Sequence, residues 1–197
     1  MKSEVLGVRG KKQRAVFLDR DGTINVEKSY LINVDEFEFI HGVPEALKKL
    51  QDAGFLLVVV TNQAGIARGY FSSEQVEKLN SYMAGLLEQY GVTLAGIYFC
   101  PHHPTCGQGE YLVDCDCRKG KPGMLLQAAN ELSIDLTTSF MVGDKLADIQ
   151  AGQAAGCKTF LVKTGYGKDF EKASATYGAK IVDDLVAAVD ILIVAEK

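Results

Sequence analysis

The sequence predicts a doubly wound α/β fold, in which helices cover both faces of a mostly parallel, Rossmann-like sheet. Short apolar runs alternate with helical patterns along the chain, and such runs between helices are typical of strands buried on both faces. Several runs end in small or acidic residues, as strands do where an open α/β sheet binds its ligand. The alternation of strands and helices also predicts right-handed crossovers.

The expected strands are short apolar runs. The run FLLVVV is the clearest, because it has no polar interruption and lies between two helical patterns. The expected strands cover residues 16–18, 55–60, 95–100, 139–144, 158–162 and 179–182. Residues 24–39 are mixed and polar, and they predict a loop or small flap over the edge of the sheet.

The expected helices are bounded by capping signals. Pro44 suits the first turn of a helix and Gly54 its end. Ser72 is followed three residues later by Gln75, which is a capping-box pattern for a helix that runs to about residue 90. Further helices are expected from residue 123, over 146–155 and over 185–194, and a glycine-bearing loop is expected after residue 162.

The composition is that of an ordinary globular protein. Apolar residues make up 47% of the 197 residues and charged residues 23%, with a net charge of −4. The acidic balance argues against a nucleic acid partner, and no window approaches the roughly 20 apolar residues of a membrane span. We expect a flexible lead-in at residues 1–14, a single domain over 15–197 without a large additional domain, a monomer, and a cytoplasmic location.

Two acids follow the first strand directly. Asp19 and Asp21 occupy alternate positions, which on a continuing strand would point to opposite faces, so the chain must bend for both to serve one site. Gly22 permits such a bend. Paired carboxylates are costly unless a cation neutralises them, and Mg²⁺ prefers oxygen ligands of this kind. The alternative is an ordinary turn at the end of a strand.

Polar residues also follow other expected strands. Thr61 and Asn62 end the second strand, and Asp144 and Asp148 lie at and after the fourth. Because the carboxyl ends of parallel strands share one edge of the sheet, we expect these residues to lie near Asp19.

Four of the five cysteines gather in or beside one long loop, at about residues 100–121. Three thiolates and one imidazole in two close pairs are the ligand set of a structural, tetrahedral Zn²⁺. The two pairs are Cys100 with His102 and Cys115 with Cys117. His103 and Cys106 stay open as substitute ligands, and iron stays open as the metal, although nitrogen and sulfur ligands favour zinc. The odd number and clustering of cysteines argue against disulfides.

The order of these motifs resembles the haloacid dehalogenase superfamily of aspartate-nucleophile phosphatases. D-x-D-G-T, a strand that ends in threonine, a lysine before a helix, and G-D-x-x-x-D follow one another over about residues 15–165. The resemblance implies that Asp19 is the nucleophile and forms an aspartyl phosphate, and that Asp21 is the general acid and base. Thr61 and a lysine would contact the phosphate, with Lys119 favoured over Lys121.

The same resemblance implies a magnesium site. Asp19, the backbone carbonyl of Asp21, and Asp144 would hold the ion, and Lys145 would add a main-chain contact. Asp148 would orient a metal-bound water or a lysine. Its alternative role is that of a solvated helix carboxylate.

Within the superfamily, the cysteine loop resembles the branch that contains histidinol-phosphate and heptose bisphosphate phosphatases. TNQAGIARG, CPHHP, CDCRK and GDKLADIQAG are similar to the heptose enzymes. The likeness implies removal of the C7 phosphate from a small-molecule sugar bisphosphate, D-glycero-D-manno-heptose 1,7-bisphosphate, in the synthesis of activated heptose for lipopolysaccharide or another surface glycan. Two alternatives stay open: histidinol phosphate as the substrate, and a non-catalytic, zinc-stabilised binding module.

The likeness to this branch also implies which residues contact the substrate. They comprise the acids after the first strand, the flap, the end of the second strand and the residues after the last cysteine, namely Asp19, Arg20, Asp21, Glu27, Lys28, Ser29, Tyr30, Thr61, Asn62, Gln63, Ala64, Arg118 and Lys119.

Overall fold

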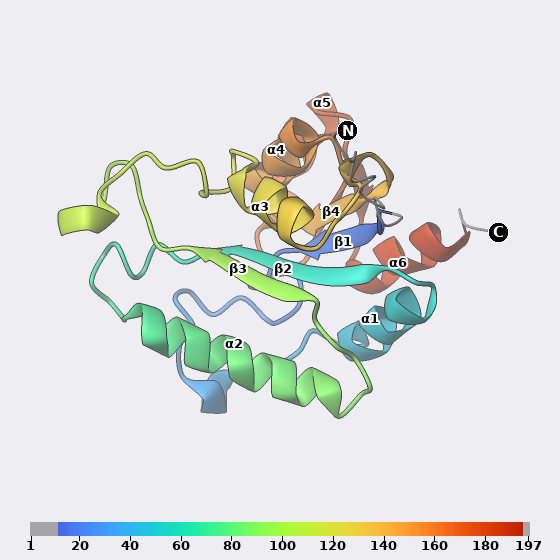
Figure 1. The fold of residues 1–197 in the computed structure, drawn as a ribbon, viewed down its shortest axis with the longest axis horizontal. Coiled ribbons are helices and arrows are strands. Elements are labelled where there is room, and N and C mark those ends of the chain that lie inside the picture. Colours follow the sequence, from blue (N-terminus) through green and yellow to red (C-terminus); the bar gives the residue numbers. More distant parts are fainter. Residues whose placement is uncertain (1–11, 195–197) are drawn as a thin grey trace, which may run out of the picture.

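The computed structural model describes residues 12–194, which form one six-stranded parallel sheet (Figure 1). Its strands are β1 (Ala15–Leu18), β2 (Leu56–Asn62), β3 (Gly96–Cys100), β4 (Phe140–Gly143), β5 (Lys158–Val162) and β6 (Lys180–Val182). They lie in the order β3-β2-β1-β4-β5-β6, and all neighbours are parallel. The predicted doubly wound sheet is confirmed, and β1 lies inside it between β2 and β4.

Six α-helices of the described chain pack around the sheet. They are α1 (Val43–Asp52), α2 (Ser73–Glu88), α3 (Gly123–Glu131), α4 (Leu146–Ala155), α5 (Gly167–Thr176) and α6 (Leu185–Val194). Figure 1 shows α1, α2 and α6 on one side of the sheet and α3, α4 and α5 on the other. None of the described helices is long and apolar enough to cross a membrane.

The two faces of the sheet have separate cores. Alternate residues of β1 point to opposite faces, so Leu18 packs with Leu47 of α1 and Met83 of α2, whereas Phe17 packs with Leu125 of α3. All five side chains are fully buried. Burial of a side chain of this size contributes about 1.5–3 kcal/mol, so the register of β1 is fixed from both sides.

The predicted start of α2 is confirmed in detail. Ser72 N donates to Gln75 Oε1 at 2.9 Å and Gln75 N donates to Ser72 Oγ at 3.4 Å, which is the reciprocal pair of a capping box. Ser72 thereby satisfies an amide that the first turn of a helix leaves without a partner.

The loop expected after β5 is only partly present, because residues 167–176 form α5. The prediction of a loop is wrong here. Within this helix of ten residues only Gly167 and Ser174 are buried, and Phe170 is the one large apolar residue. Because so few apolar residues mark this segment, its sequence did not predict a helix.

Part of the expected lead-in, residues 1–11, lies outside the described residues. Its last residues belong to the folded unit. Gln13 N donates to Ser133 O at 2.9 Å, and Arg14 O accepts from Leu56 N at 3.0 Å. The ordered chain therefore begins before residue 15.

Two helical glycines provide a paired test of packing. A Cβ atom on Gly152 of α4 would lie 2.6 Å from Met141 Cβ and 2.7 Å from Thr159 Cγ2, whereas one on Gly85 of α2 would meet nothing within 4 Å. Alanine ordinarily stabilises a helix by up to about 1 kcal/mol over glycine. We expect Gly85→Ala to raise the free energy of unfolding in urea, and Gly152→Ala to lower it by about 1–3 kcal/mol through overpacking. Equal stabilisation by both would contradict the close packing of α4 on the sheet.

Candidate active site

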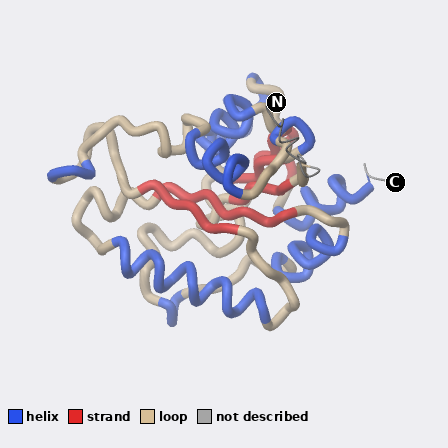
Figure 2. The backbone as a smooth tube through the Cα atoms, in the orientation of Figure 1, coloured by secondary structure: helices blue, strands red, loops and turns tan. Residues whose placement is uncertain are grey.

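Loops at the carboxyl ends of the strands surround a cavity of about 310 Å³, at the edge where Figure 2 shows the strands running into loops. The lining comes from the end of β2 and from the segments that follow β1, β2, β3, β4 and β5. It comprises Asp19, Asp21, Glu27, Ser29, Tyr30, Thr61, Asn62, Gln63, Ala64, Gly65, Arg118, Lys119, Lys145, Ala147, Asp148 and Tyr166. The structure thus brings together most of the predicted site residues.

Lys119 lies at the base of this cavity. Its Nζ is 2.6 Å from Asp19 Oδ1 and 2.7 Å from Asp148 Oδ1, and it donates to Val60 O at 2.7 Å. Burial works against the charged form, but the carboxylates of Asp148 and Asp19 outweigh it and raise the pKa of Lys119. The ammonium form is therefore favoured, and it contacts Oδ1 of Asp19.

A backbone hydrogen bond holds Lys119 in place, whereas Lys121 is paired elsewhere. Lys119 N donates to Asn62 Oδ1 at 2.9 Å, which joins the segment before α3 to the end of β2. Lys121 instead pairs with the exposed Asp114, with 2.8 Å between Nζ and Oδ1. Of the two lysines that the sequence offered for phosphate binding, the structure places Lys119 in the cavity.

Asp148 has two structural roles. Its Oδ2 accepts from Lys145 N at 2.9 Å and so caps the first turn of α4, while its Oδ1 faces the ammonium of Lys119. Only 1% of the residue is exposed, so the alternative of a solvated carboxylate is wrong. A Cβ atom on Gly143 would lie 2.3 Å from Asp148 Oδ2, which explains the glycine before Asp144 in the motif.

Asp144 is a buried acid beside other acids. One oxygen each of Asp19, Asp144 and Asp148 lies within 4.8 Å of the others. Burial, followed by the charge of Asp19, raises the pKa of Asp144 to about 8. Its Oδ2 accepts from Tyr166 N at 2.9 Å, but its Oδ1 has no hydrogen-bond partner among the described residues. An oxygen-preferring divalent cation fits this donor set, because it would satisfy that atom and offset the repulsion.

Asp21 leaves the strand direction, as predicted. Gly22 has a φ of +83°, and the bend places Asp21 in the cavity wall near Asp19. The carboxylate of Asp21 accepts from Asn25 Nδ2 at 3.0 Å and from Gln63 Nε2 at 3.0 Å. Burial favours its neutral form, but the charge of Arg20 and these hydrogen bonds outweigh burial, so the pKa of Asp21 is lowered.

Two predicted contact residues lie outside the cavity lining. The side chain of Arg20 is fully buried and pairs with Asp21, with 2.9 Å between Nη2 and Oδ2. Lys28 donates to Glu36 O at 2.6 Å and lies 3.5 Å from a Glu38 oxygen, away from the lining. In this structure Arg20 positions a neighbouring acid and Lys28 braces the flap.

The hydroxyl of Thr61 is oriented by Gln63. Gln63 Nε2 donates to Thr61 Oγ1 at 2.9 Å, so the oxygen acts as an acceptor there and its own hydrogen is left to point into the cavity. This arrangement suits donation to an anionic oxygen.

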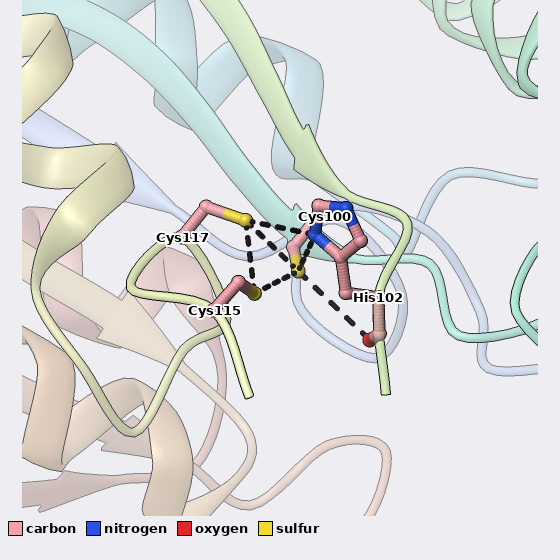
Figure 3. Close-up of side chains that lie close together, drawn as sticks. All are labelled: Cys100, His102, Cys115 and Cys117. Atoms are coloured by element: carbon pink, nitrogen blue, oxygen red, sulfur yellow. Dashed lines mark hydrogen bonds between the residues drawn. The ribbon is translucent and has the colours of Figure 1, made fainter. Parts of the chain in front are cut away.

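The cysteine loop forms a compact cluster (Figure 3). The sulfurs of Cys115 and Cys117 lie 3.1 Å apart, at 3.4 Å and 3.2 Å from Cys100 Sγ, and His102 Nδ1 is 3.4 Å from Cys117 Sγ. Four such ligand atoms around one point fit a tetrahedral metal ion.

The substitute ligands lie apart from this cluster. Cys106 is exposed, and His103 Nδ1 accepts from Cys106 N at 3.0 Å. Arg118 connects the cluster to the cavity, because its Nη1 donates to His102 O at 3.1 Å while the side chain lines the cavity.

Known proteins share this sequence and fold. A family profile described as HAD-hydrolase-like matches residues 116–188. The D-glycero-beta-D-manno-heptose-1,7-bisphosphate 7-phosphatase of Pasteurella multocida is 55% identical over 175 residues, which cover 88% of this chain and 95% of that protein. The enzyme of the same name from Escherichia coli K12 is 55% identical over 152 residues, covering 77% and 80%.

A solved structure agrees with the sequence comparison. The D,D-heptose 1,7-bisphosphate phosphatase of B. bronchiseptica, in complex with magnesium and phosphate, has a TM-score of 0.81 and 33% identity, over 92% of this chain and 99% of that chain. This chain belongs to the haloacid dehalogenase-like hydrolases. Within that family it is a phosphatase, so the alternative of a non-catalytic binding module is wrong.

Three side chains at or behind the cavity of this phosphatase were not predicted from the sequence. Tyr166 lines it from the loop after β5, and the side chain of Lys145, expected only to use its backbone, lies 3.2 Å from Glu27 Oε2 and 4.8 Å from the Tyr166 ring centroid. Asn80 of α2 accepts from Arg20. The convergence of strand ends was a signal for Tyr166, but no local pattern marked Asn80.

Removal of one cluster thiol tests the metal assignment. We expect wild-type protein and Cys106→Ser to contain about one equivalent of zinc by elemental analysis, and Cys115→Ser to contain much less, because a tetrahedral site loses one of four ligands. A loss of about 2 kcal/mol would lower the melting temperature of Cys115→Ser by about 4–8 °C. Zinc lost from Cys106→Ser but kept by Cys115→Ser would contradict the ligand set.

The raised pKa of Asp144 predicts a pH dependence of the metal-free protein. Since its folded pKa of about 8 exceeds the unfolded value of about 3.9, the folded state binds more protons between these values, and wild-type stability falls as pH rises. We expect the stability of Asp144→Asn not to fall in this way. The unfolding free energy of Asp144→Asn minus that of wild type should therefore increase by a few kcal/mol from about pH 5 to pH 8. A difference in unfolding free energy, measured with urea, that stays constant from about pH 5 to pH 8 would contradict the prediction. Added Mg²⁺ should stabilise wild type and not Asp144→Asn.

Proposed function

We propose that this phosphatase is Mg²⁺-dependent and removes the C7 phosphate of D-glycero-β-D-manno-heptose 1,7-bisphosphate, leaving the 1-phosphate. The observation that carries the proposal is the placement of Asp19 at the end of β1, 2.6 Å from the buried ammonium of Lys119 and beside Asp144. The names of the relatives support the substrate and its β anomer, and favour it over histidinol phosphate.

The first step is attack of Asp19 on phosphorus. Among the described residues, Asp19 Oδ1 receives both Arg20 N at 2.7 Å and Lys119 Nζ at 2.6 Å, which leaves Oδ2 to attack. A bond forms between Oδ2 and phosphorus while the bond from phosphorus to the C7 oxygen breaks. Asp21 supplies the proton that the departing oxygen takes, and the negative charge of the bound phosphate offsets the lowering of the pKa of Asp21.

The second step is hydrolysis of the aspartyl phosphate. Asp21, now a carboxylate, takes a proton from the water that attacks phosphorus, and the bond between phosphorus and Asp19 breaks. The protonated Asp21 and the free Asp19 carboxylate are then ready for the next ester. One side chain therefore serves as acid and then as base.

Charge on the transferring phosphoryl group is offset by fixed donors. Thr61 donates its hydroxyl and Lys119 presents its ammonium to the equatorial oxygens. Mg²⁺ held by Asp19, Asp144 and the backbone carbonyl of Asp21 would neutralise further negative charge there when bound. Lys145 stays cationic beside the site, because Asp19, Asp144 and Glu27 raise its pKa although burial opposes them.

The remaining cavity residues set the fit of the sugar. Glu27, Ser29 and Tyr30 of the flap line one side, and Arg118 lines the side nearest the cysteine cluster. The planar fork of Arg118 suits the distal phosphate. A structural zinc ion would hold the loop that carries it. The product would enter the cytoplasmic synthesis of activated heptose for a surface glycan.

Phosphate release from several esters tests the proposed function. We expect kcat/KM for heptose 1,7-bisphosphate with Mg²⁺ to exceed that for histidinol phosphate and fructose 1,6-bisphosphate by at least about a hundredfold, or roughly 2.7 kcal/mol. The β anomer should be the better substrate. Equal, slow release from all of them would remove the proposed substrate, and a preference for histidinol phosphate would replace it.

The matched variant for the covalent step is Asp19→Asn. We expect it to fold, to keep the shape of the site and to lose activity by about a thousandfold or more, because an amide oxygen is a poor nucleophile. Mass spectrometry of rapidly quenched wild-type protein should detect one added phosphoryl group on the peptide that contains residue 19. Full activity of folded Asp19→Asn would disprove the covalent mechanism.

A further inference from the structure

A buried arginine lies directly behind the proposed general acid and base. Arg20 is 0% exposed, whereas the side chain of Asp21 retains 17% exposure toward the cavity. Arg20 Nη2 lies 2.9 Å from Asp21 Oδ2, and Nε donates to Asp21 Oδ1 at 3.3 Å. The planar guanidinium thus contacts both oxygens, which fixes the plane of the carboxylate as well as its position.

The other end of the guanidinium is held by α2. Arg20 Nη1 donates to Asn80 Oδ1 at 2.9 Å, and Asn80 is itself 5% exposed. A buried charge is costly unless its donors are paired, so this contact has an energetic reason. Because Asn80 is a neutral acceptor, it orients the guanidinium without competing for the positive charge that faces Asp21.

The backbone of Arg20 does not explain these side-chain contacts. Its carbonyl accepts from the amides of Thr23, Ile24 and Asn25, at 3.3, 2.8 and 3.1 Å, and these bonds close the turn after β1. Any side chain at position 20 leaves that turn pattern available. The two-sided contact of the guanidinium is an additional constraint that acts on Asp21.

We propose that Arg20 and Asn80 form a positioning relay, in which Asn80 of α2 holds the Arg20 guanidinium so that it aims the Asp21 carboxylate at the leaving oxygen. Neither residue lines the cavity. The proposal rests on the proposed function of Asp21. It extends the machinery of the site to a helix on the opposite side of the sheet from α4.

The choice of leaving group distinguishes an effect on the orientation of Asp21 from a general effect on the stability of the fold. A sugar phosphate releases an alkoxide, which needs a proton, whereas p-nitrophenyl phosphate releases a stable phenolate, which does not. kcat/KM covers only steps through departure of the leaving group, so hydrolysis of the aspartyl phosphate does not enter the comparison. A variant that disturbs the aim of Asp21 must therefore affect the two esters unequally.

We expect Asn80→Ala and Asn80→Leu to lower kcat/KM for heptose 1,7-bisphosphate by about tenfold or more, and to change kcat/KM for p-nitrophenyl phosphate by less than about threefold. Asn80→Gln keeps a neutral acceptor oxygen for Arg20 and should stay closer to the wild-type ratio than Asn80→Leu. Met83→Ala, which removes a buried side chain from the same helix without touching Arg20's acceptor, controls for loss of packing and should also keep that ratio.

Equal losses for both esters in folded Asn80→Ala would overturn the relay and leave the proposed function intact. A ratio that moves as far in Met83→Ala as in Asn80→Ala would also overturn it, because the effect would then follow packing. If wild-type protein hydrolyses neither ester, the proposed function and the relay fail together. A selective loss for the sugar ester in Asn80→Ala and Asn80→Leu that is smaller in Asn80→Gln supports the relay.

Discussion

The ion pairs of Lys119 hold together the edge of the sheet on which the chemistry takes place. The ammonium lies between Asp19 after β1 and Asp148 at the start of α4, and it also donates to a carbonyl of β2. Without this cation two buried carboxylates would face one another unpaired, at a cost of several kcal/mol. The ammonium that is proposed to contact the phosphate is therefore also a group on which the local fold depends.

Most of the fold was predictable because it follows from burial. The continuous apolar run of β2 and the capping box at Ser72 are local signals with one physical meaning each, and both are confirmed. The convergence of Asp19, Thr61 and Asp144 required only that the strands be parallel. The four metal-site ligands followed from residue type and spacing, and the structure brings them together.

The remaining features depend on contacts that no local pattern carries. The ten residues of α5 contain only one large apolar side chain, and the direction of the Arg20 side chain depends on Asn80, sixty residues further along the chain. Lys145 was expected to act through its backbone, yet its side chain reaches Glu27 across the cavity. These side chains each had several possible partners far away in the sequence, and the partner that each contacts depends on the tertiary structure.

The position of β1 in the sheet has an evolutionary consequence. Neighbours on both sides fix the strand that precedes the proposed nucleophile, whereas the loop with the cysteine cluster follows β3 at the border of the sheet. Insertions and deletions in that border loop leave the register of β1 untouched. Substrate range can therefore diverge among descendants of one ancestral hydrolase while the reaction at phosphorus stays the same.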